Sequence, residues 1–519
     1  MRRLVGAAVV FLVLMVGVAL WLRAQNAPLP LPDNWSSLPE EQKVRFLLRY
    51  ALSTMYPQSW LTRAIPPRGR VPALGSVCER LAAVAYTFEI DPAEVSSLIS
   101  LARSEAPRTL DLIHAYAGAT YARKGLEQKA HEYLNKLVAI PEHRALIQIE
   151  LAVHYAKQGR QEVALLNLNQ ALAPKNLFTL PISTHFSRTL KQLALQGYHK
   201  EIFGSPTLRT GGNYWLHAQL LHALTEAGKL REVEEVIPIL DEHQRSVARA
   251  LLASHALRKR QLQEALRQIR STPKESIVRV HFAAELDAQG YNRLANQIRD
   301  ETYRAIRALP KNSLLRDASL TQFAAYRVLA GDVESAEKIL REIGHSWYRM
   351  TLRKLIASYY MARQQWELAR KEVTRLPQPF PPAMELAKVL HRLRVEKPAE
   401  KTTEFELPEV HDMDVPFVWN YLIPVLRLTP AEKDRIVNSL KEWLRKSPED
   451  SYVQRAERAA ELMRLLGRYE EAAALVYTLD LPAYDKHDYI VKILISMMDR
   501  RESGIQGNLN PKLGLFLSN

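Results

Sequence analysis

Two neighbouring stretches of the chain share one pattern, and that pattern decides the fold. They read AYAGATYARKGLEQKAHEYLNKLVAIP at residues 115–141 and IELAVHYAKQGRQEVALLNLNQALAP at residues 149–174. An aromatic residue, a glycine and an alanine recur 34 positions apart: Tyr121 with Tyr155, Gly125 with Gly159, and Ala130 with Ala164. A period of this length is typical of pairs of antiparallel helices joined by a tight turn.

Each repeated residue type suits one position in such a helix pair. The glycine adopts the positive φ that ends a helix and reverses the chain. A small residue such as Ala130 or Ala164 allows two helices to cross closely. Tyr121 and Tyr155 lie one turn before the glycine, where an aromatic ring is predicted to fill the space between neighbouring repeats. We therefore assign structural roles in the repeat to all six residues.

The glycine and the small residue five positions later recur more loosely along the chain. These copies are Gly228 with Val233, Arg260 with Ala265, Gly290 with Ala295, Gly331 with Ala336, Gln364 with Ala369, and Gly467 with Ala472. The steps between them are uneven, so the array is predicted to be irregular. No stretch shows sustained period-two alternation, so a sheet domain is not expected.

In these residues the chain resembles the tetratricopeptide repeat family. The second stretch carries most of the match, through Ala152, Tyr155, Gly159, Ala164, Ala171 and Pro174. The resemblance covers roughly residues 108–377 and 452–482 and is interrupted around residues 180–213. It implies an all-α fold, a right-handed α-solenoid of helix-turn-helix repeats, whose concave surface binds proteins or peptides.

The N-terminal residues predict a membrane anchor. Residues 4–22 form an apolar run without a charge, roughly as long as a bilayer core is thick. Arg2 and Arg3 precede this run, so the positive-inside bias places the N-terminus in the cytoplasm and the rest of the chain outside it. The sequence thus predicts a single-pass protein of a bacterial inner membrane, facing the periplasm. A cleaved signal peptide and an inverted orientation are the alternatives.

Composition shifts divide the chain into six predicted segments. They are a signal anchor (1–23), a Pro-rich linker (24–40), the solenoid (41–395), an acidic linker (396–416), a C-terminal helical part (417–500) and a loose tail (501–519). Three helix starts are predicted from a capping residue followed by proline, at Asp91, Thr429 and Ser447.

Positive charge is the remaining functional clue in the sequence. The chain has 71 basic and 56 acidic residues, and residues 245–281 hold nine of the former against two of the latter. This region predicts attraction of an anionic partner, such as an acidic peptide, a lipid headgroup or an acidic polysaccharide; a solvated helix face is the alternative. The candidate partner-binding residues are Arg123, Lys157, Arg245, Arg249, Arg258, Lys259, Arg260, Arg267 and Arg270.

Three of these cations occupy equivalent places, two residues before a turn. Arg123, Lys157 and Arg258 are either contacts in the concave groove or cations that offset the dipole at a helix end. Both interpretations remain open from sequence alone.

The sequence contains no motif of a known catalytic or metal site. H-E-x-x-H, G-x-x-x-x-G-K-[ST] and G-x-S-x-G are all missing from it. We therefore expect no enzyme, no cofactor and no metal. The family resemblance instead implies a membrane-tethered scaffold that binds protein partners and assists an envelope, secretion or polymer-export complex. The alternatives are an RNA-binding helical-repeat protein, suggested by repeat length and basic charge, and an enzyme with an unrecognised site.

Overall fold

The structure is a computed structural model, and it describes residues 31–54, 74–174, 183–210, 214–311, 313–376, 381–395, 406–409, 418–479, 481 and 483–502. Every element in these residues is helical, so the described fold is all-α. The N-terminal third comprises η1 (Trp35–Ser37), α2 (Glu40–Thr54), α4 (Leu74–Thr87), η2 (Pro92–Val95), α5 (Ser96–Glu105), η3 (Pro107–Thr109), α6 (Leu110–Arg123), α7 (Glu127–Glu132), the π-helical turn η4 (Tyr133–Leu137), α8 (Pro141–Lys157) and α9 (Gln161–Ala171).

The middle of the chain begins with short, irregular helices and continues with longer pairs. It comprises α10 (Ser183–Leu193), η6 (Ala194–Tyr198), α11 (His199–Gly204), α12 (Pro206–Thr210), α13 (Tyr214–Glu226), α14 (Leu230–Val236), η7 (Ile237–Ile239), α15 (Glu242–Arg258), α16 (Leu262–Arg270), α17 (Val278–Ala288) and α18 (Asn292–Ala308). The irregular part coincides with residues 180–213, where the sequence pattern is interrupted.

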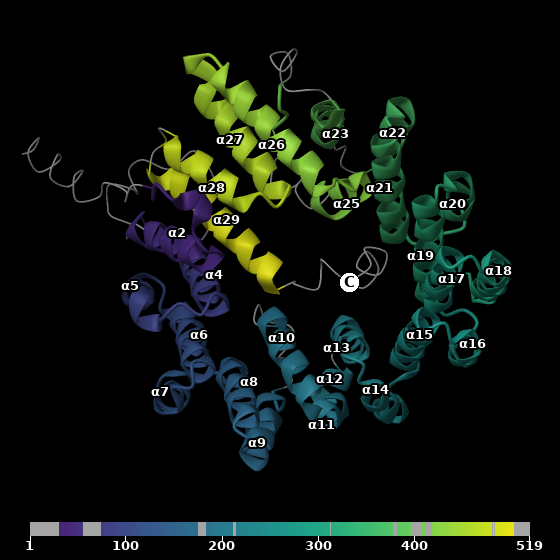
Figure 1. Ribbon diagram of the computed structural model, residues 1–519, viewed down its shortest axis with the longest axis horizontal. Coiled ribbons are helices and arrows are strands. Elements are labelled where there is room, and N and C mark those ends of the chain that lie inside the picture. Colours follow the sequence, from purple (N-terminus) through teal and green to yellow (C-terminus); the bar gives the residue numbers. More distant parts are fainter. Residues whose placement is uncertain are drawn as a thin grey trace, which may run out of the picture.

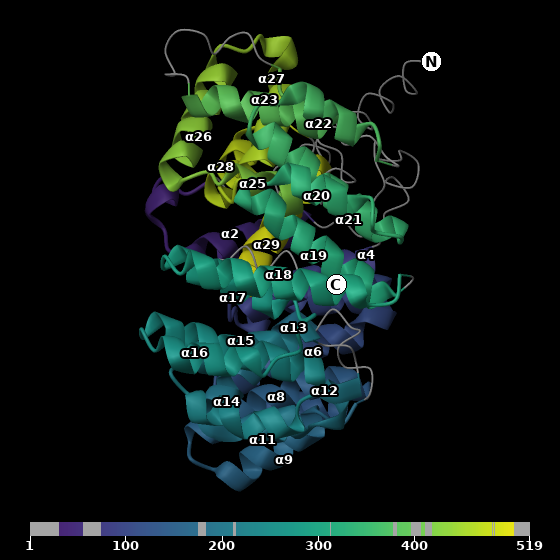
Figure 2. The ribbon, with the colours of Figure 1, turned by 90° about the vertical axis from the view of Figure 1, so that its right-hand side faces the viewer.

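The last third returns to regular pairs. It comprises α19 (Leu314–Ala330), α20 (Val333–Leu340), α21 (Ser346–Ala362), α22 (Trp366–Val373), α23 (Pro381–Val395), η8 (Val418–Leu422), α25 (Ile423–Leu426), α26 (Pro430–Arg445), α27 (Glu449–Leu465), α28 (Tyr469–Thr478) and α29 (Ala483–Glu502). The pairs from α15–α16 to α21–α22 lie above one another in order (Figure 2).

The helices follow a closed course, and the last helix returns to the first (Figure 1). α29 packs against α2 and α4, which lie about 400 residues before it in the sequence. Trp35 Nε1 donates to the carbonyl of Glu470 (3.2 Å), and Lys43 Nζ forms an ion pair with the Glu470 carboxylate (2.6 Å). Thr54 Oγ1 lies 3.1 Å from Nδ1 of His487. The two ends of the described chain therefore form one joint.

The turn inside a helix pair repeats one geometry. Its central residue has a φ between +59° and +93° at Gly125, Gly159, Gly228, Arg260, Gly290, Gly331, Gln364 and Gly467. In each case the next amide donates to the carbonyl five residues before it, as Leu126 N does to Tyr121 O (2.9 Å) and Gln365 N to Tyr360 O (2.9 Å). This bond caps the carbonyls at the end of the first helix.

The residue five positions after each turn, an alanine in seven of the eight pairs and a valine in the other, is completely buried. Ala130, Ala164, Val233, Ala265, Ala295, Ala336, Ala369 and Ala472 are all 0% exposed. Tyr121 and Tyr155 are also buried, the first beside Tyr133 of its own pair and the second against His131 and Glu127 of the preceding pair. The residue predicted to lie at a close helix crossing is therefore buried in all eight pairs.

One turn of this kind has no signature in the sequence. Glu89 has a φ of +55°, and Ile90 N donates to the Ala85 carbonyl (2.9 Å). It lacks both the glycine and the small residue five positions on, so the repeat pattern did not identify it.

Replacing turn residues should change stability in opposite directions at two sites. A Cβ at Gly159 meets nothing within 4 Å, so Gly159→Ala adds only backbone strain and should lower the free energy of unfolding by about 1–2 kcal/mol. Gln364 already carries that strain at φ +59°, so Gln364→Gly should raise the free energy of unfolding by up to about 1 kcal/mol. Urea unfolding followed by circular dichroism measures both changes, and effects of the same sign would contradict the shared geometry.

The structure corrects the prediction of a single-pass membrane protein. Among the residues that the structure describes, no helix is long and apolar enough to cross a membrane. The longest of them, α29, has 20 residues, but it carries charges such as Lys486 and Arg500 and packs its apolar face on α2 and α4. Residues 4–22, the predicted anchor, lie outside the described residues. The single-pass assignment, with its cytoplasmic N-terminus and periplasmic solenoid, is therefore not retained.

Two of the three predicted helix caps are present, and the third is wrong. The Asp91 carboxylate accepts from Ala93 N (2.9 Å), and Thr429 forms a reciprocal capping box with Glu432. Ser447 instead donates its hydroxyl to the Trp443 carbonyl of the preceding helix (3.0 Å). Such back-bonding competes with capping in serine, so α27 begins without a side-chain cap.

Part of the predicted acidic linker packs against the C-terminal helices. Within residues 396–416 the structure describes only residues 406–409. Leu407 is 1% exposed, and its carbonyl accepts from Arg458 of α27 (2.8 Å). Glu406 forms an ion pair with Arg455 of the same helix. This piece is therefore attached to α27, and the remainder, like the tail from residue 503 onward, lies outside the described residues.

Candidate partner-binding surfaces

The first helices of successive pairs run parallel on the inner side of the closed course (Figure 1), and we call them the inner helices. Their two ends form two edges of the molecule, which we call rims. Figure 1 places α16, α18 and α20 outside α15, α17 and α19. We name the edge at which the inner helices begin the start rim, and the edge that carries the turns the turn rim. Acids near the beginning of one inner helix cap the beginning of the next: Asp111 accepts from Ala139 N and Asp317 from His345 N, each at 2.7 Å.

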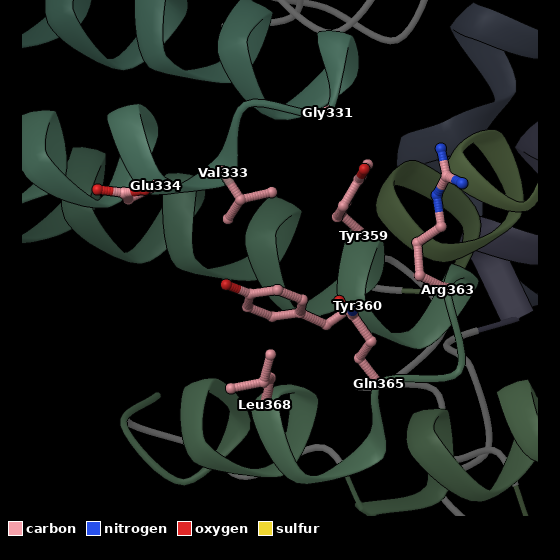
Figure 3. A pocket seen from close by; sticks show the side chains of 8 residues that line it. All are labelled: Gly331, Val333, Glu334, Tyr359, Tyr360, Arg363, Gln365 and Leu368. Atoms are coloured by element: carbon pink, nitrogen blue, oxygen red, sulfur yellow. The ribbon is translucent and has the colours of Figure 1, made fainter.

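A surface pocket lies on the turn rim between two successive pairs. It measures about 370 Å³ and is lined by Gly331, Val333, Glu334, Tyr359, Tyr360, Arg363, Gln365 and Leu368. Figure 3 shows the Tyr360 ring between Val333 and Leu368, and the Tyr359 side chain on the side of Gly331. Leu368 is 42% exposed, so one apolar wall faces solvent. A pocket of this size accepts a side chain or a short peptide segment.

Polar groups hold the aromatic wall of this pocket in place. The Tyr360 hydroxyl donates to Glu337 Oε1 of α20 (2.9 Å), which ties one pair to the next. Burial, together with that hydrogen bond and the Glu337 charge, raises the pKa of Tyr360 above its ordinary value, so the phenol stays protonated. The Arg363 guanidinium lies 5.5 Å from the Tyr359 ring centroid. The walls therefore offer apolar contact, the exposed cation of Arg363 and the exposed carboxylate of Glu334.

Arg123, a predicted groove contact, is instead held in a buried network. Its guanidinium is 10% exposed and donates to both carboxylate oxygens of Glu150, at 2.6 and 3.2 Å. Tyr86 donates to the same carboxylate (2.5 Å), as does Thr189 (2.7 Å). The network joins four successive inner helices, α4, α6, α8 and α10.

The charge of Arg123 determines the protonation state of this network. Burial alone would raise the pKa of Glu150, but the positive charge and hydrogen bonds of Arg123, with those of Tyr86 and Thr189, hold that pKa below its ordinary value. Burial would lower the pKa of Arg123, and the Glu150 charge overcomes this effect and raises it. Both groups are therefore ionised at neutral pH.

The other two turn cations lie in more open places. Lys157 is exposed at the end of α8. Arg258, at the end of α15, pairs with Glu226 at the end of α13 (2.7 Å). The three equivalent positions therefore have three different environments.

The basic residues of α15 and α16 do not form one patch. Arg258, Lys259 and Arg260 are exposed on the turn rim. Two others lie toward the start rim, where Arg245 donates to the Asp241 carbonyl (3.3 Å) and Arg249 donates to the Ser271 carbonyl (2.6 Å). The last two lie on α16, where Arg267 pairs with Glu264 (2.7 Å) and Arg270 is exposed at the helix end. The helix pair thus separates the charges that the sequence had grouped.

Two features of the described residues concern metal binding and nucleophilic catalysis. No cluster of three or more histidines, cysteines and acids that could hold a metal ion is present among these residues. Cys78 is buried in α4, and burial, with the nearby Glu79 charge, raises the pKa of its thiol to about 11. That thiol is protonated at neutral pH and is a poor nucleophile.

The position of the turn-rim pocket could have been predicted in part from the sequence. Gly331 and Gln364 were both identified as turn positions of successive pairs, and the pocket lies between those two turns. Its remaining lining residues have no distinctive type or spacing.

No protein-family model and no curated protein matches the chain.

Proposed function

We propose that the chain is a tetratricopeptide-like, right-handed α-solenoid that acts as a non-enzymatic scaffold for protein partners. The observation that carries the proposal is the recurrence of one turn geometry in eight helix pairs of the described residues. Stacked pairs of this kind expose an extended surface with grooves between successive turns, as between Gly331 and Gln364. The expected role in envelope, secretion or polymer-export complexes depended on the membrane anchor and is not carried further.

RNA binding is the second candidate, because the chain carries a formal net charge of +15. The placement of the cations favours protein partners. Arg123 and Arg258 are engaged by carboxylates, and the basic residues of α15 and α16 point to different edges. A binder of single-stranded RNA would need a continuous basic track with exposed aromatic rings.

Site-specific photo-crosslinking in the cells that naturally produce the protein tests the scaffold. A photoreactive phenylalanine analogue at Leu368, on the pocket wall, should give reproducible adducts with one or a few proteins. The same analogue at Leu166, which is 57% exposed on α9, serves as the matched control. Adducts at neither position, together with a gel shift of single-stranded RNA that weakens as salt rises, would favour the RNA-binding alternative.

A further inference from the structure

The start rim of α19 and α21 exposes a group of large apolar side chains. Leu314 and Leu315, the first two residues of α19, are 61% and 60% exposed, and Trp347, the second residue of α21, is 42% exposed. The two helix starts are adjacent, because Asp317 Oδ2 accepts from both Gly344 N (3.0 Å) and His345 N (2.7 Å). These three side chains, which we call the start-rim anchors, therefore lie at one edge of the array.

Positive charge surrounds the start-rim anchors. Residues 304–317 and 338–353, which form this edge, contain eight lysines and arginines against two acids. Four of these bases are exposed and form no ion pair with a described carboxylate: Arg304, Lys311, Arg341 and Arg349. The edge is thus both apolar and strongly basic.

The two acids of this edge are already engaged. Glu342 lies between Arg307 (3.1 Å) and Arg316 (3.4 Å) and also accepts from the Tyr303 hydroxyl (3.2 Å). The Asp317 carboxylate caps the start of α21. Neither acid is available to neutralise the exposed bases, so this edge presents a net positive charge to the solvent.

From this arrangement we infer that the start rim of α19–α21 binds an acidic segment of a partner protein that carries apolar anchor residues. The inference rests on the proposed scaffold function and assigns it a surface and a partner chemistry. Carboxylates of the segment complement Arg304, Lys311, Arg341 and Arg349, which speeds association and sets orientation. Its apolar residues cover Leu314, Leu315 and Trp347, which supplies most of the affinity because buried aromatic and apolar anchors dominate binding energy.

Two other exposed apolar residues differ from the start-rim anchors in their surroundings. Leu166 on α9 is as exposed as Leu314, but its helix carries no lysine or arginine. Leu368 lies on the turn rim of the same array, beside Glu367 and Glu334. Leu166 is therefore a suitable control for the start-rim surface, and Leu368 tests binding at the pocket.

A random-peptide display library, selected on the full chain, provides the probe. We expect enriched peptides that combine Asp or Glu with Leu, Phe or Trp. The best synthetic peptide is then measured by fluorescence anisotropy at low and high salt. Leu314→Ser with Leu315→Ser, and separately Trp347→Ala, should weaken binding about tenfold or more, whereas Leu166→Ser should leave it unchanged. Leu368→Ser reports whether a peptide occupies the turn-rim pocket instead. Lys311→Glu with Arg341→Glu should weaken binding mainly at low salt.

Several outcomes overturn the inference without touching the scaffold proposal. One is a selected peptide whose binding depends on Leu368 and not on the start-rim anchors. A second is the lack of any enriched acidic peptide while photo-crosslinking still captures a partner. A third is binding to vesicles rich in anionic phospholipid that the start-rim variants abolish, which would identify a lipid surface. A fourth is self-association of the wild type, lost in the same variants, which would identify a second copy of the chain.

Discussion

Glu150→Leu is expected to lower the free energy of unfolding of the N-terminal helix pairs by about 3–5 kcal/mol. The substitution leaves the buried Arg123 guanidinium without its carboxylate and deprives the Tyr86 and Thr189 hydroxyls of their common acceptor. An unpaired charge in a buried site costs far more than the pair itself contributes. Hydrogen exchange of the α4, α6, α8 and α10 amides measures the loss locally, and urea unfolding measures it globally.

Two controls separate the lost charge pair from a general effect of substitution. Glu132→Gln removes an exposed carboxylate, paired with Lys136 across one helical turn, and should cost less than about 0.5 kcal/mol. Combining Glu150→Leu with Arg123→Met removes both charges and should recover most of the stability. A double variant as unstable as the single one would show that packing, and not the unpaired guanidinium, causes the loss.

The same network predicts how acid affects stability. The folded state lowers the pKa of Glu150. The stabilisation that ionised Glu150 adds to the free energy of unfolding is therefore complete above the ordinary glutamate pKa and is lost as pH falls through the lowered pKa. The difference in stability between wild type and Glu150→Leu should therefore be constant near neutral pH and shrink in acid. A difference that persists unchanged to low pH would contradict an ionised Glu150.

Local features of the fold were predictable because each depends on a few neighbouring residues. Gly125 and Gly159 end helices with positive φ, and even the non-glycine turn positions Arg260 and Gln364 adopt it. The spacing to a buried small residue identified those turns when the glycine was missing. The turn at Glu89 lacks both signals, so nothing in its sequence distinguished it from a continuing helix.

The environment of a side chain was less predictable than the helix that carries it. Arg123 and Lys157 occupy the same position in two repeats, yet one is buried and the other exposed. The difference comes from Glu150 and Tyr86, which lie 27 and 37 residues from Arg123 and belong to other helix pairs. A repeat pattern specifies the backbone position but not which neighbours surround it.

Leu494→Asp is expected to open the joint between the two ends of the described chain. Leu494 is 0% exposed in α29, among Ile490, Ile493 and Met497, which are at most 2% exposed, and α29 packs on α2 and α4. A carboxylate buried there costs several kcal/mol unless the helix separates from its neighbours. Separation of α29 from α2 and α4 lets the new carboxylate reach water.

The effect should remain confined to the joint, because each helix pair of the proposed solenoid is stabilised mainly by its nearest neighbours. Amides of α2 and α29 should lose their protection from hydrogen exchange, while α15 to α22 keep theirs. The radius of gyration from X-ray scattering should increase as the ends separate, with helix content nearly unchanged. Lys492→Ala, on the same helix but 36% exposed, is the control and should change neither measurement. If α2 keeps its protection in Leu494→Asp, the contacts of Trp35 and Lys43 with Glu470 hold the joint without the apolar face of α29. If the whole chain unfolds instead, the helices fold as one cooperative unit and not as an array of separately stabilised pairs.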